Sequence, residues 1–321
     1  MVNTILQIFS KLRFVIIILL LSSFIPSCGL FDREIQQDKR IAEFRYRMNL
    51  VMDSRDKHKE RIAALEGIIE DINTDEYLVT PRKKNILLME GNMFISNEYL
   101  GLKNYKKAIK YTNIIIDMDS ASPKGFYNRG CIYQILDEDS LAILDYGKAL
   151  KLDSDHSDAY YNRGIIYEEL GDYDKALDDY NKAIKLNPSY IADVYINRGN
   201  TYLAKKACDK AISDYDKVIN MDTANVKAYC NRAGAYIMQN RYDEALTDCN
   251  KAIALDSTNI NAYSKRASIY EQRKQYHEAL DDCEKILILD PHDRSGTHRS
   301  VKKAIKKLRL LVKNKQAGLY K

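Results

Sequence analysis

The sequence predicts an all-α fold in which helical hairpins stack in a row, and three observations support this prediction. Only 13 of the 321 residues are Gly and only 5 are Pro, while Ala, Leu, Ile, Lys and Asp are abundant, a composition that favours helix over sheet. One short phrase of sequence recurs about every 34 residues, and a second recurs in step with it. Repeats of this length are typical of helical solenoids, in which each hairpin buries an apolar face against its neighbours.

The chain begins with the features of an export signal. Lys11 and Arg13 precede an apolar stretch from Phe14 to Ile25. A basic start, a short apolar core and a small residue before a cleavage point are typical of a secretory signal. The stretch is too short to span a bilayer as a helix, which needs about 20 residues. We therefore expect residues 1–27 to be a signal peptide.

The end of this segment, Ile25-Pro26-Ser27-Cys28, resembles a bacterial lipobox. The resemblance implies that Cys28 is acylated, with palmitate or a similar fatty acid, and becomes the N-terminus of a lipoprotein. Several acyl chains anchor a protein almost permanently, because each buried methylene contributes about 0.8 kcal/mol. Gly29 stands where an Asp is often associated with inner-membrane retention, so we expect the outer membrane of the bacterial cell envelope. A plain secretory signal or an uncleaved anchor is the alternative.

Residues 28–80 are expected to form a linker and a helical segment. Two apolar stripes with helical spacing lie between residues 33 and 73. They are Ile41, Phe44, Met48 and Val51, and Ile62, Leu65, Ile69 and Ile72. We expect them to pack against the first repeat, and self-association into a homodimer is the alternative. Thr80 and Pro81 predict a helix start, with Thr80 as N-cap and Pro81 at the first helical position.

The body of the chain is an internal repeat. The first phrase is Asn-Arg-Gly or a variant of it, and its copies begin at Asn128, Asn162, Asn197, Asn231 and Lys265. A small residue recurs in step, at Ala142, Ala176, Ala211, Ala245 and Ala279. Four residues after each of these stand Tyr146, Tyr180, Tyr215, Cys249 and Cys283.

This pattern resembles the tetratricopeptide repeat. In the repeat that begins at Ser157, Gly164, Ala176 and Ala183 stand at positions 8, 20 and 27, where the family has small residues that let two helices approach closely. The resemblance implies a right-handed α-solenoid of about six hairpins over residues 81–293. The six repeats are assigned to 89–122, 123–156, 157–190, 192–225, 226–259 and 260–293.

The last five repeats carry an unusual pair of charges. Position 7, which is usually Leu in the family, holds Arg129, Arg163, Arg198, Arg232 and Arg266. Position 23 holds Asp145, Asp179, Asp214, Asp248 and Asp282. The first repeat has neither charge. Because the two charges occur together, we predict structural, charge-assisted Arg–Asp bonds within or between adjacent repeats.

In this family the first helix of each hairpin lines a concave groove, so the resemblance implies a peptide-binding site there. Position 6 holds a row formed by Asn128, Asn162, Asn197 and Asn231, followed by Lys265. An amide both donates and accepts, so such a row can pair with the backbone of an extended peptide. It resembles the asparagine ladder in the repeat domain of O-linked N-acetylglucosamine transferase. Neighbouring candidates are Tyr127, Tyr161, Asp158, Glu168, Glu169, Asn200 and Lys227. The alternative is that the Asn side chains bond locally.

A rival site is the clamp with which some co-chaperones grip a C-terminal carboxylate. Asn200 and Asn231 match two of its five positions, and Lys265 is similar at a third. Ile196 and Asn261 stand where the clamp has Lys, and two missing cations leave little to hold a carboxylate. We therefore expect the clamp to be absent.

Residues 294–321 are predicted to be a basic capping helix with a tail. Val301, Ile305, Leu308 and Val312 form its apolar stripe, and ten Lys or Arg but no Asp or Glu follow residue 293. Solenoids need polar end caps, and binding to anionic lipid or an acidic partner is the minority alternative. The net charge of the whole chain is +5, and the cations of residues 1–27 and 294–321, where there is no acid, more than account for it. Residues 28–293 are therefore acidic, which argues against a nucleic-acid partner.

The sequence contains no catalytic motif such as G-x-x-x-x-G-K or H-E-x-x-H. We expect no cofactor and no metal, even at His292 and His298. Cys249 and Cys283 are expected to be small buried hydrophobes, and Cys131 and Cys230 to face the groove. The sequence therefore predicts a non-enzymatic, membrane-anchored scaffold for protein or peptide partners. The alternatives are a self-associating structural protein of the envelope and a co-chaperone-type carboxylate binder.

Overall fold

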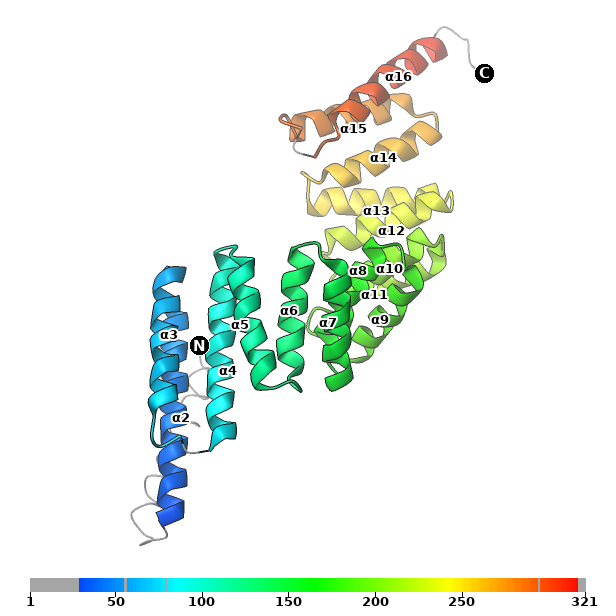
Figure 1. Ribbon diagram of the computed structural model, residues 1–321. Helices are drawn as coiled ribbons and strands as arrows, with labels where there is room; N and C mark the ends of the chain where they lie inside the picture. Colours follow the sequence, from blue (N-terminus) through cyan, green and yellow to red (C-terminus); the bar gives the residue numbers. More distant parts are fainter. Residues whose placement is uncertain (1–28, 55–56, 79, 294, 317–321) are drawn as a thin grey trace. The chain divides into compact units, whose positions relative to one another are not determined.

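The computed structural model describes residues 29–54, 57–78, 80–293 and 295–316, and Cys28 lies outside them together with the predicted signal peptide. Within these ranges the chain forms fifteen α-helices and no strand, as the sequence predicts (Figure 1). The first five are α2 (Gly29–Asp53), α3 (His58–Thr74), α4 (Pro81–Gly101), α5 (Tyr105–Met118) and α6 (Pro123–Ile135). The next five are α7 (Asp139–Leu152), α8 (Ser157–Glu169), α9 (Tyr173–Lys185), α10 (Ile191–Ala204) and α11 (Cys208–Met221). The last five are α12 (Val226–Met238), α13 (Tyr242–Leu255), α14 (Ile260–Gln272), α15 (Tyr276–Leu289) and α16 (His298–Gln316).

The chain divides into two compact units, Met1–Ile132 and Tyr133–Lys321. None of the described helices is both long enough and apolar enough to cross a membrane.

The first unit is held together by one apolar cluster that joins α2, α3, α4 and α5. Phe44 and Met48 of α2 and Leu65 and Ile72 of α3 are each 2% exposed or less and pack with Leu87 of α4. The two predicted stripes therefore pack against the hairpin that follows them. The stripe of α3 is turned slightly from the predicted one, because Ile68 is buried while Ile69 is only half-buried.

The start of α4 is where the sequence predicts it, but the cap differs. Pro81 is the first residue of the helix and Thr80 precedes it. The Thr80 hydroxyl does not cap the helix; it donates instead to Gln37 Oε1 of α2 at 3.0 Å. The expected side-chain cap is thus replaced by a tertiary hydrogen bond, which becomes available because α2 packs beside this turn.

The second unit is a stack of antiparallel hairpins. α8 packs on α9, α10 on α11, α12 on α13, and α14 on α15, and each hairpin also packs on the next (Figure 1). The turn inside each hairpin contains one residue with positive φ, at Gly171, Lys206, Asn240 and Lys274. In this left-handed conformation a helix ends and the chain reverses, so the second helix can lie against the first.

Close contact inside the hairpins depends on a small residue in the first helix. A Cβ built on Gly164 would lie 2.8 Å from the Tyr180 ring, and one on Gly199 would lie 2.7 Å from the Tyr215 ring. Both rings are fully buried. The glycines at position 8 therefore make room for the tyrosines at position 24.

The stack ends with α16. Val301, Ile305 and Leu308 are buried in one cluster with Cys283 and Ile286 of α15, as expected of a capping helix. Val312, the fourth residue of the predicted stripe, is half-buried.

Candidate functional site

The hairpins of the second unit are locked by the Arg–Asp pairs that the sequence predicts. Arg198 donates from Nε to Asp214 Oδ2 at 2.7 Å and from Nη2 to Asp214 Oδ1 at 2.6 Å. The same two bonds occur in three other repeats, at Arg163–Asp179, Arg232–Asp248 and Arg266–Asp282. The four Asp side chains are 3–6% exposed and the four Arg side chains 13–20%. Each pair is therefore an interior link between the two helices of its own hairpin.

The arginines also reach the preceding hairpin. Nη1 of Arg198 donates to Asn181 Oδ1 at 2.6 Å, and Nη1 of Arg266 donates to Asn250 Oδ1 at 2.7 Å. Arg232 makes the corresponding bond to Asp216. Its bonds to Asp248 and Asp216 hold the pKa of Arg232 above its ordinary value. This second set of acceptors stands at position 25, and no pattern in the sequence indicated it.

The fifth predicted pair, Arg129 and Asp145, has one member in each unit. In the first unit, Nη1 of Arg129 donates to Asn113 Oδ1 at 2.6 Å, which is the same bond to position 25 of the preceding repeat. Asp145 is a buried residue of α7 in the second unit. At the place that corresponds to Asn181, the repeat before Arg163 has Gly147, so no side chain is available there to accept from Arg163.

In these four hairpins each arginine lies over two tyrosine rings, those at positions 4 and 11. The Arg198 guanidinium lies 5.3 Å from the centre of the Tyr195 ring and 5.8 Å from that of Tyr202. Arg163, Arg232 and Arg266 lie over the equivalent rings at 5.5–5.8 Å. Cation–π contacts of this kind fix a guanidinium plane and add to its ion pair.

The first helices α8, α10, α12 and α14 carry the groove candidates of the second unit on one face, here called the inner face. Two of the four asparagines join neighbouring hairpins: Asn197 Nδ2 donates to Tyr161 Oη at 3.0 Å, and Asn231 Nδ2 donates to Asn200 Oδ1 at 3.0 Å. Tyr215 Oη also donates to Asn200 Oδ1, at 2.7 Å. For these two asparagines, the local hydrogen bonds that were the alternative to a peptide-binding row are therefore present.

The local bonds leave hydrogen-bonding capacity unused. An amide has two N–H donors and one oxygen acceptor, and Asn197 and Asn231 each use one N–H within the described part of the chain. Both side chains are half-buried. They are therefore held in fixed orientations, each with a second N–H and an oxygen that no described residue engages.

Acids lie at one end of the inner face and cations at the other, except for Glu271 of α14, which is paired with Lys307. Asp158, Glu168, Glu169 and Asp193 lie on α8 and α10. Burial raises the pKa of Glu168, whose carboxylate accepts a hydrogen bond from Tyr180 Oη at 2.7 Å. The cations of the face, Lys227 and Lys265, lie on α12 and α14.

Lys265 occupies a special place on this face. Its Nζ is 3.5 Å from where a Cβ on Gly234 would stand, so the side chain lies across α12 in a space that a larger residue would fill. Lys265 is half-buried and makes no hydrogen bond or ion pair with any described residue. It is therefore a half-buried cation without a counter-ion among those residues.

The other residues predicted to line the groove include Lys227, Asn128 and Cys230. Lys227 is exposed at the first turn of α12. Asn128, with its neighbour Tyr127, belongs to the first unit, where its amide is directed to Met93 Sδ. Cys230 does not face the groove as expected. It is 5% exposed, and its Sγ lies 3.6 Å from Asn259 Oδ1, because position 5 packs under the start of the next hairpin.

The carboxylate clamp finds no support in this geometry. Ile196 is 1% exposed and belongs to the core, so its position could not hold a cation that faces a ligand. Asn200 and Asn231, the two residues that match the clamp, are bonded to each other.

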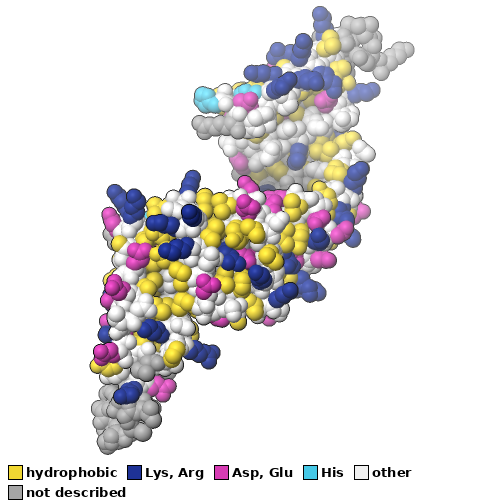
Figure 2. Space-filling model, viewed as in Figure 1, with side chains coloured by type: hydrophobic (Ala, Val, Ile, Leu, Met, Phe, Trp, Pro, Cys, Tyr) yellow, Lys and Arg dark blue, Asp and Glu magenta, His cyan; other side chains and the backbone are white. Residues whose placement is uncertain are grey.

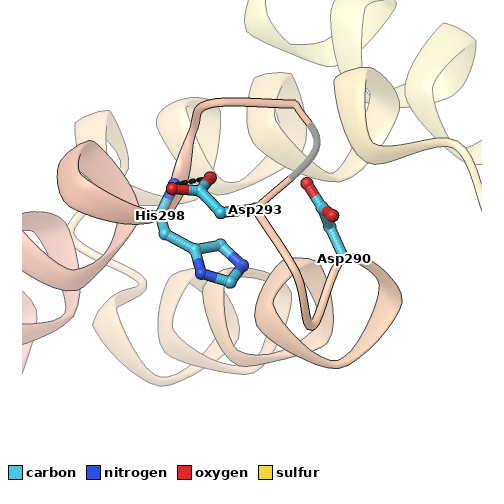
Figure 3. Close-up of side chains that lie close together, drawn as sticks. All are labelled: Asp290, Asp293 and His298. Atoms are coloured by element: carbon cyan, nitrogen blue, oxygen red, sulfur yellow. Dashed lines mark hydrogen bonds between the residues drawn. The ribbon is translucent and has the colours of Figure 1, made fainter.

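The described residues bring together one group with metal-ligand chemistry, although the sequence predicts no metal. Asp290, Asp293 and His298 place ligand atoms within 4.8 Å of one another in the turn before α16 (Figure 3). However, Asp290 Oδ2 accepts from the Ser295 amide at 2.8 Å and hydroxyl at 2.6 Å. Asp293 Oδ1 accepts from the backbone N–H of His298 at 2.9 Å. Both carboxylates therefore accept hydrogen bonds from the loop itself, and these bonds are enough to explain why the carboxylates lie close together.

Cys249 and Cys283 are small buried hydrophobes, as expected, at 0% and 5% exposure. Burial raises the pKa of Cys249 to about 12 and that of Cys283 to about 11. Such thiols are un-ionised at neutral pH and therefore poor nucleophiles.

Comparison with known proteins identifies the repeats. Models of the tetratricopeptide repeat match residues 157–190, 192–225, 226–259 and 260–293, and a further model of the repeat matches residues 136–171. No curated protein sequence matches the chain.

Solved structures share the fold. The C-terminal part of a repeat-containing protein from Cytophaga hutchinsonii is 22% identical, with a TM-score of 0.59 over 82% of this chain and 99% of that one. PilF from Pseudomonas aeruginosa is 17% identical, with a TM-score of 0.57 over 70% of this chain and 98% of that one. A tetratricopeptide repeat protein from Parabacteroides merdae is 18% identical, with a TM-score of 0.53 over 85% of this chain and 99% of that one.

These likenesses establish an α-solenoid. Proteins of the family and fold are typically non-enzymatic scaffolds that bind other proteins. The sequence matches and the stacked hairpins lead to the same conclusion: the chain is a tetratricopeptide repeat protein.

Proposed function

We propose that this chain is a membrane-anchored scaffold of the bacterial cell envelope that binds an extended segment of a partner protein on its inner face. The observation that carries the proposal is the state of Asn197, Asn231 and Lys265. The two amides are held by hydrogen bonds and Lys265 is half-buried against α12, and all three keep polar groups that no described residue engages. Preorganised polar groups of this kind bind a peptide backbone without first having to become ordered.

The charge pattern of the face indicates the chemistry of the partner segment. A peptide along the inner face would meet Asp158, Glu168 and Asp193 on α8 and α10, and then Lys227 and Lys265 on α12 and α14. Complementary charges fix the direction of binding and exclude wrong partners. The preferred segment therefore has basic residues at one end and an acidic residue or a carboxyl terminus at the other.

A selection of random peptides tests this proposal. Residues 29–321 are immobilised, and peptides of random sequence displayed on phage are enriched on them. The selected peptides should lose about tenfold or more in affinity when Asn162→Ala, Asn197→Ala and Asn231→Ala are combined, since each lost amide contact to a peptide contributes about 0.5–1.5 kcal/mol.

A control triple, Lys182→Ala, Lys185→Ala and Lys251→Ala on exposed positions of α9 and α13, should leave binding unchanged. Thermal melting of each variant shows whether it is folded. Equal affinity of the selected peptides for the asparagine triple and the wild type would exclude the inner face.

The anchor is proposed from Cys28, and its test is chemical. A clickable fatty acid fed to the producing cells should label the wild-type chain and leave the Cys28→Ser variant unlabelled. Lipid incorporation by the Ser variant would show that the anchor, and with it the proposed outer-membrane location, is misassigned.

Self-association is the second candidate, and one surface favours it. Tyr46 and Leu50 on the outer side of α2 are 67% and 58% exposed. Exposed apolar residues one turn apart on a helix suit a helix-to-helix contact. Sedimentation of residues 29–321 should show a dimer that Tyr46→Glu disrupts; a wild-type monomer at every concentration removes this candidate.

A further inference from the structure

The last helix, α16, has a face that neither the core nor the inner face uses. With 3.6 residues per turn, the side chains opposite the buried stripe of Val301, Ile305 and Leu308 lie on a single solvent-facing strip. That strip, here called the outer strip, consists of Arg299, Lys302, Lys303, Lys306, Leu310 and Lys313. All six are exposed.

The cations of the outer strip have no partner among the residues that the structure describes. On its two flanks, Lys307 pairs with Glu271, and Arg309 Nη2 lies 2.9 Å from Glu284 Oε1. By contrast, Arg299, Lys302, Lys303, Lys306 and Lys313 form no hydrogen bond or ion pair with any described residue. Figure 2 shows the basic side chains gathered along α16.

The sequence around the strip contributes no acid that could neutralise it. From Arg294 to the end of the chain there is no Asp or Glu. A capping helix needs only a polar outer side, and a mixture of acids and bases provides that at lower electrostatic cost. Five cations on one side of one helix, none of them paired with a described residue, therefore exceed what capping requires.

An apolar residue stands within this basic strip. Leu310 is 58% exposed and follows Lys306 by one turn of the helix. An exposed Leu gains nothing from free anions, but it does gain from the boundary between headgroups and acyl chains. The strip is also a straight helix surface about 20 Å long, so it can lie along a flat bilayer surface over its whole length.

We propose that the outer strip of α16 binds the surface of a bilayer that contains anionic phospholipids. The cations attract the negative headgroups, and Leu310 enters the headgroup region. This contact does not depend on the inner face. It would add a second, reversible attachment to that proposed at Cys28.

Vesicle flotation tests the proposal on residues 29–321, which contain every described core residue and lack the apolar segment at residues 14–25. The protein should float with vesicles that contain phosphatidylglycerol and stay behind with phosphatidylcholine alone, and high salt should release it. Combining Lys302→Glu, Lys303→Glu and Lys306→Glu should weaken binding about tenfold or more.

The matched control is Lys182→Glu, Lys185→Glu and Lys251→Glu, which makes the same change in net charge at exposed lysines of α9 and α13. It should bind as the wild type does. Equal losses in the two triple variants, or equal binding to both kinds of vesicle, would overturn the proposal. So would displacement from vesicles by free glycerol phosphate at matched phosphate, or by polyglutamate at matched charge, because either result identifies a site for anions or acidic chains.

Discussion

Arg198 joins three helices with a single side chain. It bonds twice to Asp214 in its own hairpin and once to Asn181 in the preceding one, and it lies over two tyrosine rings. A buried ion pair is often no more stabilising than the apolar residues that could replace it. What distinguishes an arginine pair is its directionality, since the planar guanidinium donates its hydrogen bonds only in fixed directions. These arginines therefore fix the register of one hairpin on the next.

Gly147 offers a test of this interpretation. In the pattern of the other repeats it stands where Asn113, Asn181 and Asn250 accept from an arginine, and a Cβ built on it would lie 3.7 Å from Arg163 Nη1. We predict that Gly147→Asn raises the free energy of unfolding by about 1 kcal/mol, through one new hydrogen bond and a better helix former than Gly. Urea denaturation measures the change.

Gly147→Ala is the control, because it improves the helix without adding an acceptor. Asn is the poorer helix former of the two by several tenths of a kcal/mol. The hydrogen bond is present if the Asn variant is as stable as the Ala variant or more so. A clearly lower stability of the Asn variant contradicts the interpretation.

The buried thiols give a pH dependence with a definite sign. The pKa of Cys249 is about 12 in the folded chain, while an unfolded Cys has a pKa of about 8.5. The folded state therefore holds this proton more tightly, and above about pH 8.5 the unfolded state loses it first. We predict that Cys249 lowers the free energy of unfolding by up to about 1.4 kcal/mol for each pH unit from about 8.5 upward.

The measurement compares the wild type with Cys249→Ala at several pH values. Tyrosines also titrate above pH 9, but they are common to both proteins and cancel in the difference. The difference in unfolding free energy between the two proteins should change steadily above about pH 8.5. A constant difference would mean that the thiol is not shielded.

At this scale the sequence predicts what recurs and misses what varies. The Arg–Asp pairs could be predicted because both members are present in five repeats and absent from the first. The acceptors at position 25 could not, because that position holds Asn181, Asp216 and Gly147 in successive repeats and so shows no common residue. The bond from Thr80 to Gln37 was equally hidden, since no pattern relates residues 43 apart in unlike helices.

At the scale of the hairpin, the two helices are fitted to each other through positions 8 and 24. Gly164 faces Tyr180 and Gly199 faces Tyr215, whereas the next two repeats have Ala233 with Cys249 and Ala267 with Cys283. A larger residue in one helix thus goes with a smaller residue in the other. Dense packing requires this, because interiors tolerate neither a void nor an overlap.

A double-mutant cycle measures this fit. Gly199→Ala should lower the free energy of unfolding by about 1–3 kcal/mol, because the added methyl would lie 2.7 Å from a fully buried ring. In the Tyr215→Cys background the same change should be neutral or stabilising, since the combination then matches Ala233 with Cys249. The coupling between the two changes is the quantity to compare.

Gly67→Ala in α3 is the matched control for the substitution itself. A Cβ built on Gly67 meets no heavy atom within 4 Å, so the change should stabilise the chain by about 0.5–1 kcal/mol through helix propensity alone. If Gly199→Ala has the same effect in both backgrounds, the fit between positions 8 and 24 is not what selects Gly.

At the scale of the whole chain, a solenoid has no closed core, so each hairpin depends on its neighbours. The repeat length was enough to predict the all-α stack, because a period near 34 residues leaves little choice of fold. The division into the units 1–132 and 133–321 could not be predicted, since the repeat pattern runs through the boundary without interruption. The helices that flank the repeats could be predicted, because apolar stripes with helical spacing continue before the first repeat and after the last one.

The dependence of each hairpin on its neighbour predicts how the chain responds to loss of its last helix. Deleting residues 294–321 would expose Cys283 and Ile286, which pack with Val301, Ile305 and Leu308 of α16. The burial of about three apolar side chains is lost, at roughly 1.5–3 kcal/mol each, and the loss falls on α14 and α15 first. Amide hydrogen exchange should therefore quicken strongly in α14 and α15, less in α12 and α13, and hardly at all in α8 and α9. A variant with Leu308→Ala should show the same gradient in weaker form. Uniform acceleration over all these helices would instead mean that the second unit opens as a single cooperative block, and the account of a stack stabilised from neighbour to neighbour would then be wrong.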